Sequence, residues 1–203
     1  MPTLVVITGC PGTGKSYLAN LLLQRFPSLQ LKSYDTLKEE FWDRYGFQDP
    51  EEKRRNTACS LQQYYADLAR AMLLKTDLLI EYPFHLGHKA VLSQLIQTYA
   101  YTAVTILMHG QMDVIYARSI QRDSNGHRHP GHLLNRYHLG DTAEDSDAQR
   151  SLTYEEFLAD CSRKDYNIQL GHTISVDVTD YAAVDYGAVL DEVQQFGDWS
   201  RQG

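Results

Sequence analysis

Cysteine is scarce in the 203-residue sequence, and no two of its three thiols, Cys10, Cys59 and Cys161, form a Cys-x-x-Cys pair. This scarcity excludes a disulfide framework and is typical of a reduced protein. Long apolar runs are also missing, since no stretch approaches the ~18–20 apolar residues that cross a membrane. The opening Met-Pro-Thr-Leu carries no basic region of the kind that begins a signal peptide. We therefore expect a cytoplasmic protein with no membrane partner.

Positive charge is in short supply as well. The sequence has 19 lysines and arginines against 26 aspartates and glutamates, and its formal net charge is -7 at pH 7. This balance argues against a broad nucleic-acid-binding surface, which normally has a basic face, but it leaves room for a small basic pocket. A chain of this length with 43% apolar residues is expected to fold as one domain over residues 1–203.

Short apolar runs alternate along the chain with segments of helical spacing. Runs rich in β-branched residues or leucine predict five strands, at Thr3–Thr8, Leu29–Ser33, Leu78–Tyr82, Thr102–His109 and Thr173–Val178. The run Leu78-Leu79-Ile80 does not alternate with polar residues, which is typical of a strand buried on both faces. The pattern predicts an α/β fold with a parallel sheet of about five strands and helices on both faces.

The segments between these strands have apolar residues at helical spacing. We expect helices from about Leu18 to Phe26, over 36–45, in a long segment after the capping sequence Asp49-Pro50-Glu51-Glu52, and over about 88–99, 111–122, 153–163 and 184–196. Residues 123–150 break this rhythm, because they are rich in Asp, Gly, His and Arg and nearly free of apolar residues. A segment of this kind inside a compact domain predicts a lid insertion or a disordered loop.

A glycine-rich turn joins the first strand to the first helix. Its residues match the P-loop pattern G-x-x-x-x-G-K-[ST] in full: Gly9, Cys10, Pro11, Gly12, Thr13, Gly14, Lys15 and Ser16. Glycines let the backbone fold tightly with its N–H groups pointing inward, and the helix that follows directs the positive end of its dipole at the same place. We expect Lys15 to reach the β- and γ-phosphates of a nucleotide and the Ser16 hydroxyl to ligate Mg²⁺. Cys10 is interpreted as a small, tolerated residue of the loop.

A P-loop alone does not identify a reaction. The sequence contains no Asn-Lys-x-Asp or Thr-Lys-x-Asp, which disfavours a guanine-reading GTPase, and it is too short for most motor or transporter ATPases. Small phosphotransferases remain. Such an enzyme needs a carboxylate that accepts the proton of the acceptor hydroxyl, and cations around the transferring phosphoryl group.

Two acids follow predicted strands at the edge of the sheet where ligands of open α/β folds bind. Asp35 comes after the second strand and Glu81 ends the third. For Asp35 two interpretations are open, a catalytic carboxylate or the N-cap of the helix over 36–45. A carboxylate at the end of a buried strand is costly unless it is paired with a cation or a metal, which favours a functional role for Glu81.

Basic residues gather where the lid region begins. Arg118 and Arg122 are one helical turn apart, and Arg128 follows inside the lid. These arginines either clamp phosphate groups or form a solvated helix end. We expect the phosphate clamp, because a guanidinium group matches the geometry of phosphate oxygens. Four histidines fall in the same region, at positions 127, 129, 132 and 138. Their spacing fits no standard structural zinc site, and we expect hydrogen-bonding or substrate roles.

The order of these motifs resembles a known group of proteins. The segments "GCPGTGKS", "KSYDTLKEEFWDRYGF", "LLIEYPF", "RSIQRDSNGHRHPGH" and "ISVDVTD" are similar to those of small bacterial AAA-family P-loop kinases of uncharacterised substrate, which are related to polynucleotide kinase, zeta-toxin and chloramphenicol phosphotransferase. The resemblance covers about residues 5–195 and implies a nucleoside-monophosphate-kinase-like P-loop NTPase fold. It implies ATP-Mg²⁺ at Lys15 and Ser16, Asp35 as catalytic base, and Arg118 and Arg122 as paired lid arginines that contact the nucleotide. Two positions depart from the pattern, with Tyr17 where threonine is common and Tyr82 where glycine often follows the glutamate.

These observations predict an ATP-dependent kinase that moves the γ-phosphoryl group to a hydroxyl of a small-molecule acceptor. In this hypothesis Lys15, Asp35, Glu81, Arg118 and Arg122 are catalytic; the P-loop residues with Arg118, Arg122 and Arg128 bind ATP, and Ser16 and Glu81 bind Mg²⁺. Three aromatic residues, Tyr34, Trp42 and Tyr45, are candidates for the lining of the acceptor site, although aromatics on a helix usually lie in the core. Two alternatives remain open: a polynucleotide 5′-hydroxyl kinase, and an ATP-binding regulatory or toxin-like module without turnover.

Overall fold

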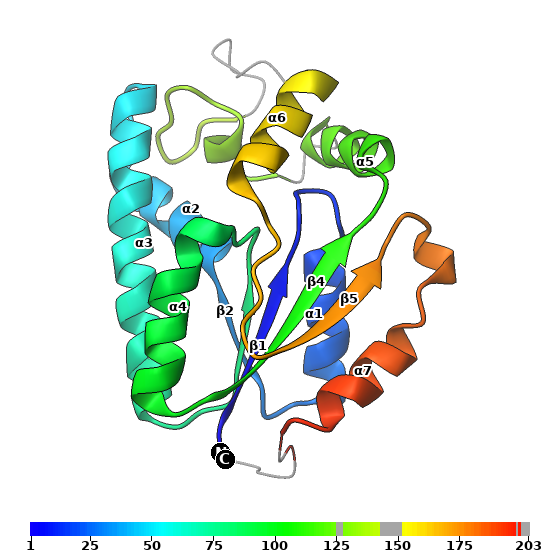
Figure 1. The fold of residues 1–203 in the computed structure, drawn as a ribbon. Coiled ribbons are helices and arrows are strands. Elements are labelled where there is room, and N and C mark those ends of the chain that lie inside the picture. Colours follow the sequence, from blue (N-terminus) through cyan, green and yellow to red (C-terminus); the bar gives the residue numbers. More distant parts are fainter. Residues whose placement is uncertain (125–127, 143–151, 198, 200–203) are drawn as a thin grey trace.

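The computed structural model of the chain describes residues 1–124, 128–142, 152–197 and 199. Its sheet has five parallel strands in the order β2-β3-β1-β4-β5 (Figure 1). The strands are β1 (Thr3–Thr8), β2 (Gln30–Ser33), β3 (Leu78–Glu81), β4 (Thr102–His109) and β5 (His172–Asp177). The predicted parallel sheet is therefore confirmed, with ends shifted by one residue in β2, β3 and β5. The first strand lies at the centre of the sheet because the chain crosses over it in both directions.

Helices cover both faces of the sheet, and the alternation of side chains along β1 shows why (Figure 1). Val5 and Ile7 pack into a core with α1 (Lys15–Arg25) and α7 (Tyr186–Gln194). Their neighbours Leu4 and Val6 point the other way, into a second core with α3 (Pro50–Leu73) and α4 (Leu86–Tyr99). All four of these β1 side chains are fully buried, as expected for a central parallel strand.

The remaining helices stand near the carboxyl ends of the strands (Figure 1). They are α2 (Tyr34–Tyr45), α5 (Met112–Ser124) and α6 (Tyr154–Lys164), with two 3-10 turns, Pro130–His132 and Tyr181–Ala183. All the predicted helices are present. The C-terminal one was expected over 184–196 and spans Tyr186–Gln194, because the 3-10 turn and the Asp185 cap delay its start.

Local capping sets where two helices begin. Asp49 accepts hydrogen bonds from the backbone N–H groups of Glu51 and Glu52, both at 2.8 Å, and Pro50 occupies the first turn of α3, as the sequence predicts. Helix α6 begins with a full capping box between Thr153 and Glu156. The second of these helices borders the site described below, through Lys164 near its end.

The polar segment expected over 123–150 contains a small core among its described residues. Within the described residues 128–142, Leu134 and Tyr137 pack against Trp42 and Phe47 in a small core of their own. Phe47 and Tyr137 also form an antiparallel β-bridge, with both N···O distances at 2.8 Å. The interpretation as a disordered loop is therefore wrong for residues 128–142, because their few apolar side chains pack against the end of α2 and Phe47. The function of the segment as a lid remains a prediction, and His127 lies outside the described residues.

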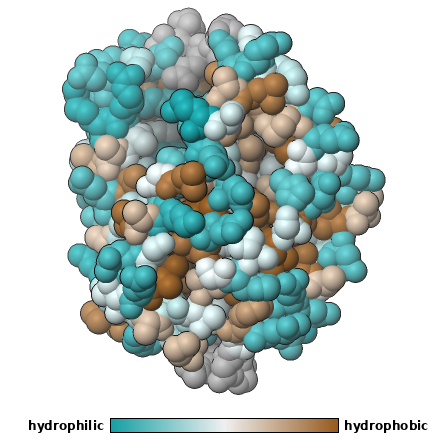
Figure 2. Space-filling model, viewed as in Figure 1, coloured by the Kyte–Doolittle hydropathy of each residue, from teal (hydrophilic) through white to brown (hydrophobic). Residues whose placement is uncertain are grey.

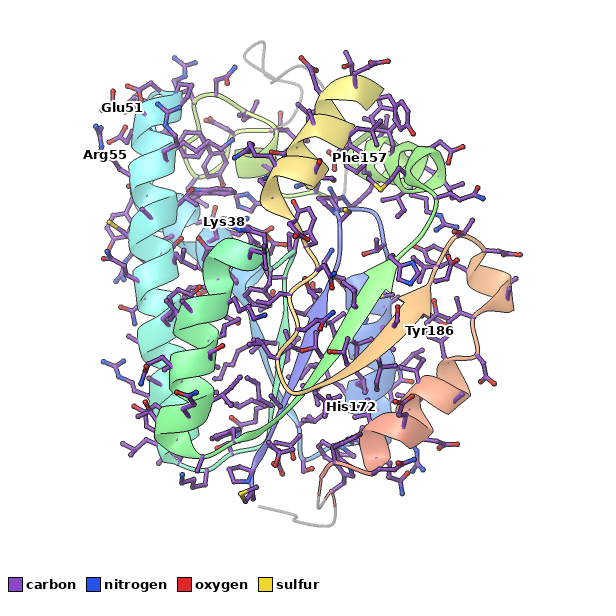
Figure 3. The ribbon with its side chains drawn as sticks, viewed as in Figure 1. Lys38, Glu51, Arg55, Phe157, His172 and Tyr186 are labelled. Carbon is purple, nitrogen blue, oxygen red and sulfur yellow. The ribbon has the colours of Figure 1, made fainter. Side chains whose placement is uncertain are left out.

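The outer surface is mostly polar. Figure 2 shows hydrophilic side chains spread over the face viewed in Figure 1, with smaller hydrophobic groups between them. Figure 3 shows how a single helix divides its side chains, since Glu51 and Arg55 stand on the outer side of α3 and form an ion pair at 2.8 Å. Among the described residues, no helix combines the length and apolar character needed to cross a bilayer.

Candidate active site

The P-loop lies between β1 and α1, and its shape depends on glycine. Gly9 and Gly12 have φ values of 146° and 92°, and an added Cβ would lie 2.2 Å from the Met108 carbonyl oxygen and 2.5 Å from the Ile115 carbonyl oxygen, respectively. Gly14, the N-cap of α1, provides no side-chain cap, and the first turn of the helix contains no acid. The N-terminus of α1 is thus presented to a ligand rather than neutralised by the protein, which fits an anion such as a phosphate group.

Lys15 projects from the first turn of α1 and is almost completely buried. Its Nζ donates to the carbonyl oxygens of Gly9 at 3.1 Å and Cys10 at 3.0 Å. Burial lowers the pKa of Lys15 to about 8, and the nearby charges of Glu81 and Asp35 oppose this shift. The lysine therefore lies next to the glycine turn, in an environment where its positive charge is poorly solvated.

Glu81 meets the P-loop from the end of β3. The register of the sheet places Glu81 beside Ile7 of β1 and Ser33 of β2, and the Ser16 hydroxyl donates to Glu81 Oε1 at 2.9 Å. Burial raises the pKa of the Glu81 carboxyl, while Lys15 and the Ser16 hydrogen bond act against the rise. A hydroxyl and a carboxylate are oxygen ligands of the kind that Mg²⁺ prefers. The described residues contain no group of three or more His, Cys, Asp or Glu that holds a metal alone, so such an ion here needs phosphate oxygens and water to complete its shell.

Asp35 lies across from Lys15 and Glu81, at the start of α2. Its two interpretations, a catalytic carboxylate or a helix N-cap, can now be separated. Helix α2 begins at Tyr34 and its N-cap is Ser33, whose side chain accepts from the Thr36 N–H at 3.4 Å. Asp35 is thus not the cap. Its carboxylate instead forms an ion pair with the Nζ of Lys38 at 2.6 Å and lines the cavity.

Lys38 is a site residue that the sequence reasoning missed. Its side chain is 8% exposed, and its Nζ lies over the rings of Tyr34, Trp42 and Tyr82 at 5.4, 5.3 and 5.1 Å. Aromatic faces and the Asp35 carboxylate together stabilise the buried ammonium group. The i,i+3 spacing from Asp35 was the available signal, and it identifies this contact only once Asp35 is known to be inside the helix.

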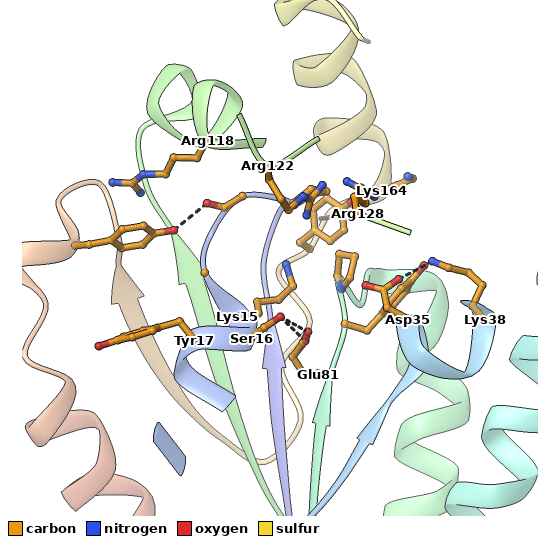
Figure 4. Close-up of a pocket in the computed structure, with 17 residues that line it drawn as sticks. Lys15, Ser16, Tyr17, Asp35, Lys38, Glu81, Arg118, Arg122, Arg128 and Lys164 are labelled. Carbon is orange, nitrogen blue, oxygen red and sulfur yellow. Dashed lines mark hydrogen bonds and ion pairs between the residues drawn. The ribbon is translucent and has the colours of Figure 1, made fainter. Parts of the chain in front are cut away.

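These groups face one another across a cavity of about 450 Å³ at the carboxyl ends of the central strands (Figure 4). Figure 4 shows Lys15, Ser16 and Glu81 on one side, Asp35 and Lys38 on another, and a row of cationic side chains above them. The cavity includes most of the predicted site and adds residues that the sequence did not suggest, namely Tyr17, Lys38, Pro83, Lys164, Tyr166 and Tyr181. The volume is in the range typical of small-molecule sites.

The three predicted arginines all line this cavity, but they are held differently. The Arg118 guanidinium lies 3.7 Å from the centre of the Tyr181 ring and donates to the carbonyl oxygens of Val178 and Thr179. Arg122 and Arg128 both pair with Asp123. The structure thus brings the expected cations to one place, with Arg118 fixed by the loop after β5 and the other two sharing one carboxylate.

A tyrosine-lined hollow of about 270 Å³ adjoins the P-loop beside Arg118. Its lining is Gly14, Tyr17, Tyr181 and Tyr186. The Tyr181 hydroxyl donates to the Gly12 carbonyl oxygen at 3.0 Å, which ties the loop after β5 to the glycine turn. Tyr17, which departs from the family pattern, packs edge-on against Tyr186 with ring centres 5.3 Å apart. A flat, apolar group is the ligand that such a surface accepts.

The three aromatic candidates for the lining of the acceptor site do not line it. Tyr34 and Trp42 are 2% and 3% exposed and belong to the core, while Tyr45 is exposed on the surface. The Tyr34 hydroxyl is used inside the protein, by a hydrogen bond to the Thr57 carbonyl oxygen at 2.9 Å. None of the three borders the cavities described here. The aromatic residue from this region that does so is Tyr82, which comes directly after Glu81.

The lid histidines within the described residues form hydrogen bonds, as expected. His129 and His132 reach across to two acids of α2, with 3.1 Å from His129 Nε2 to Asp43 Oδ1 and 2.7 Å from His132 Nε2 to Glu39 Oε1. His138 Nε2 lies 2.7 Å from the Gln48 Nε2. The first two contacts link residues more than 80 positions apart in the chain and hold the segment around Arg128 over α2.

The Cys10 side chain turns away from the cavity. It packs against a cluster that contains Ile115, Phe157 and Cys161 of α5 and α6. The backbone of Cys10, and not its thiol, is therefore the part that would face a bound nucleotide. A hydrogen bond with Cys161 and the charge of Lys15 lower the pKa of the Cys10 thiol, against the effect of burial. The same hydrogen bond and burial raise the pKa of Cys161.

The Cys161→Ala variant is expected to react more slowly with iodoacetamide at Cys10. Loss of the donor raises the Cys10 pKa, and one pKa unit changes the thiolate fraction about tenfold. Peptide mass spectrometry after timed alkylation at pH 7.5 measures the rate, with the exposed Cys59 as internal reference. An unchanged Cys10 rate would show that the two thiols do not interact.

The fold and the glycine turn define a P-loop NTPase fold, and known structures agree. A provisionally assigned kinase from Chloroflexus aurantiacus is similar over 97% of this chain and 99% of its own, with a TM-score of 0.74 and 27% identity. A gluconokinase from Sinorhizobium meliloti has a TM-score of 0.54 and 14% identity over 96% and 97% of the two chains. The tunicamycin resistance protein of Deinococcus radiodurans has a TM-score of 0.57 and 14% identity, and the match covers 96% of this chain and 95% of its own. No protein-family model matches the sequence, and no curated protein sequence matches it significantly.

Proposed function

We propose that the protein is a kinase that transfers the γ-phosphoryl group of ATP to a hydroxyl of a small molecule. The observation that carries this proposal is the arrangement across one cavity. A phosphate-binding turn with Lys15 and the Ser16–Glu81 pair lies on one side, and the Asp35 carboxylate faces it from α2. A nucleotide-binding module needs only the first of these sides, whereas phosphoryl transfer also needs the second.

On the donor side, the backbone of the glycine turn and Lys15 bind the phosphates. The tyrosine-lined hollow beside Arg118 accommodates the base, since its lining is apolar and adjoins Gly14. Ser16 and Glu81 would hold Mg²⁺, which neutralises phosphate charge when bound. Lys15 changes its contacts from the carbonyl oxygens of Gly9 and Cys10 to the phosphates, which gives its poorly solvated charge a stronger partner.

On the acceptor side, Asp35 takes the proton of the attacking hydroxyl as the new O–P bond forms. Lys38 holds this carboxylate in place from within the same helix. Arg122 and Arg128 exchange part of their pairing with Asp123 for the phosphoryl oxygens, where charge develops in the transition state. The fold neighbours described as kinases, including the gluconokinase, support this assignment.

Binding of MgATP is expected to raise the melting temperature by roughly 5–10 °C at ~100 times the dissociation constant, since such a ligand adds about 2.7 kcal/mol. Gly12→Ala is expected to abolish the shift, because its Cβ would meet the Ile115 carbonyl oxygen and distort the turn. Gly140→Ala is the matched control: it also changes a glycine at positive φ, but no atom lies within 4 Å of its added Cβ. Scanning fluorimetry with and without MgATP measures all three proteins, and circular dichroism confirms that each is folded.

If MgATP and other nucleoside triphosphates all leave the melting temperature of the unaltered protein unchanged, the proposed function is wrong. A shift that survives in Gly12→Ala would place the nucleotide elsewhere.

A further inference from the structure

A second cavity, of about 590 Å³, extends from Asp35 towards the lid segment. It shares the phosphoryl-transfer region with the first cavity and continues between α2 and residues 128–132. Every lining residue that the structure describes is polar or charged: Ser16, Ser33, Asp35, Thr36, Glu39, Glu81, Arg122, Arg128, His129 and His132. Small-molecule sites are usually lined mostly by apolar and aromatic side chains with a few polar groups. This lining is therefore informative about what enters the cavity.

Hydrogen-bond acceptors line one side of this cavity and hydrogen-bond donors line the other. On the α2 side, Asp35 and Glu39 are four residues apart and thus lie on one face of the helix, with Thr36 between them. On the opposite side, the guanidinium groups of Arg122 and Arg128 present donors. A nucleobase or an aryl group finds no aliphatic side chain and no tyrosine, tryptophan or phenylalanine to stack against among these lining residues. A molecule with several hydroxyls fits, because each hydroxyl both donates and accepts a hydrogen bond.

Glu39 is fixed in this wall by a defined chain of contacts. Arg128 donates to His132 Nδ1 at 3.3 Å, so the imidazole carries its proton on Nε2 and donates it to Glu39 Oε1 at 2.7 Å. Burial and the surrounding cations, Lys38, Arg128 and Lys53, lower the pKa of His132, which keeps this neutral tautomer at pH 7. Burial also raises the pKa of Glu39, with Asp35 adding to the effect and His129, Lys38 and Arg128 opposing it. The hydrogen bond from His132 is to Oε1, and the second carboxylate oxygen, Oε2, is also a hydrogen-bond acceptor.

We propose that the acceptor is a small polyhydroxylated molecule of the sugar class. Asp35 takes the proton of the reacting hydroxyl, and Glu39, held by His132, binds a second hydroxyl of the same molecule. Glu39 is thus a specificity residue of the acceptor side. This inference rests on the proposed kinase activity and adds the chemical class of its substrate.

The test is an acceptor panel in which ADP release and the phosphorylated product, by mass spectrometry, are both measured. The panel contains aldoses, polyols and sugar acids in one arm, and nucleosides and aryl alcohols in the other. We expect turnover in the first arm. With the best acceptor, Glu39→Gln is expected to raise KM about 10- to 100-fold, because a charged hydrogen-bond acceptor is lost, and to change kcat and MgATP affinity little. Glu40→Gln, at an exposed position on the same helix, is the control and should leave KM unchanged.

Deoxy analogues of that acceptor link the residue to the hydroxyl. The analogue that lacks the hydroxyl bound by Glu39 should lose affinity with the unaltered protein and show little further loss with Glu39→Gln. Turnover of a nucleoside or an aryl alcohol alone would overturn the inference while supporting the kinase. MgATP binding without turnover of any sugar-class compound would also overturn the inference. Failure to bind any nucleotide would instead overturn the proposed function.

Discussion

Asp35→Asn is expected to lower phosphoryl transfer by about 10²- to 10⁴-fold, the range that a positioned general base contributes. Asparagine keeps the size of the side chain and a hydrogen-bonding oxygen, but it does not take up the hydroxyl proton. MgATP affinity should change little, since the glycine turn, Lys15 and the Ser16–Glu81 pair lie on the other side of the cavity (Figure 4). Pre-steady-state transfer and equilibrium nucleotide titration measure the two effects separately.

The same substitution leaves Lys38 without its charged partner, so a loss of stability has to be distinguished from a loss of chemistry. Asp35 is 39% exposed, which limits the stability cost of the lost ion pair. Urea unfolding of Asp35→Asn and of the exposed control Glu40→Gln reports this cost directly. Transfer that is unchanged in a folded Asp35→Asn protein would contradict the assignment of Asp35 as the catalytic base.

The fold was predictable because its signals are local. A glycine turn between an apolar strand and a helix, and buried runs such as Leu78-Leu79-Ile80, are visible in short windows of sequence. Asp35 and Glu81 could be found for a related reason: in a parallel sheet, residues that follow neighbouring strands meet at one edge, wherever they stand in the chain. The register of β3 with β1 and β2 confirms this for Glu81.

Other parts of the site depend on contacts that a sequence does not display. Whether Asp35 caps α2 or lies inside it depends on a helix boundary of one or two residues, which is the least certain feature of a helical pattern. The link from His132 to Glu39 joins positions 93 residues apart and exists only because the lid segment folds back on α2. The core interpretation holds for Trp42 because its helix packs against that same segment.

Lys15→Met is expected to lower transfer by about 10²- to 10³-fold, as for the loss of one group that stabilises transition-state charge. It is also expected to weaken MgATP binding. Methionine fills similar volume without a charge, so the variant should fold. The unaltered protein should also show a pH-dependent stability. The pKa of Lys15 is about 8 in the folded protein and near 10.5 in the unfolded chain. Between these values the unfolded chain binds more protons, so the free energy of unfolding should rise with pH.

Lys53 supplies the control, because burial also lowers its pKa to about 8 while its Nζ bonds to the Leu134 carbonyl oxygen, outside the P-loop. Urea midpoints at pH 7.5 and 9.5 should show a smaller rise in stability with pH in both Lys15→Met and Lys53→Met.

Nucleotide binding separates the two lysines. Phosphate charge raises the pKa of Lys15, so MgATP binding at pH 8.5 should take up protons, as measured by calorimetry in buffers of different ionisation enthalpy. Lys53→Met should keep this uptake and Lys15→Met should lose it; uptake that persists without Lys15 would mean that another group meets the phosphates.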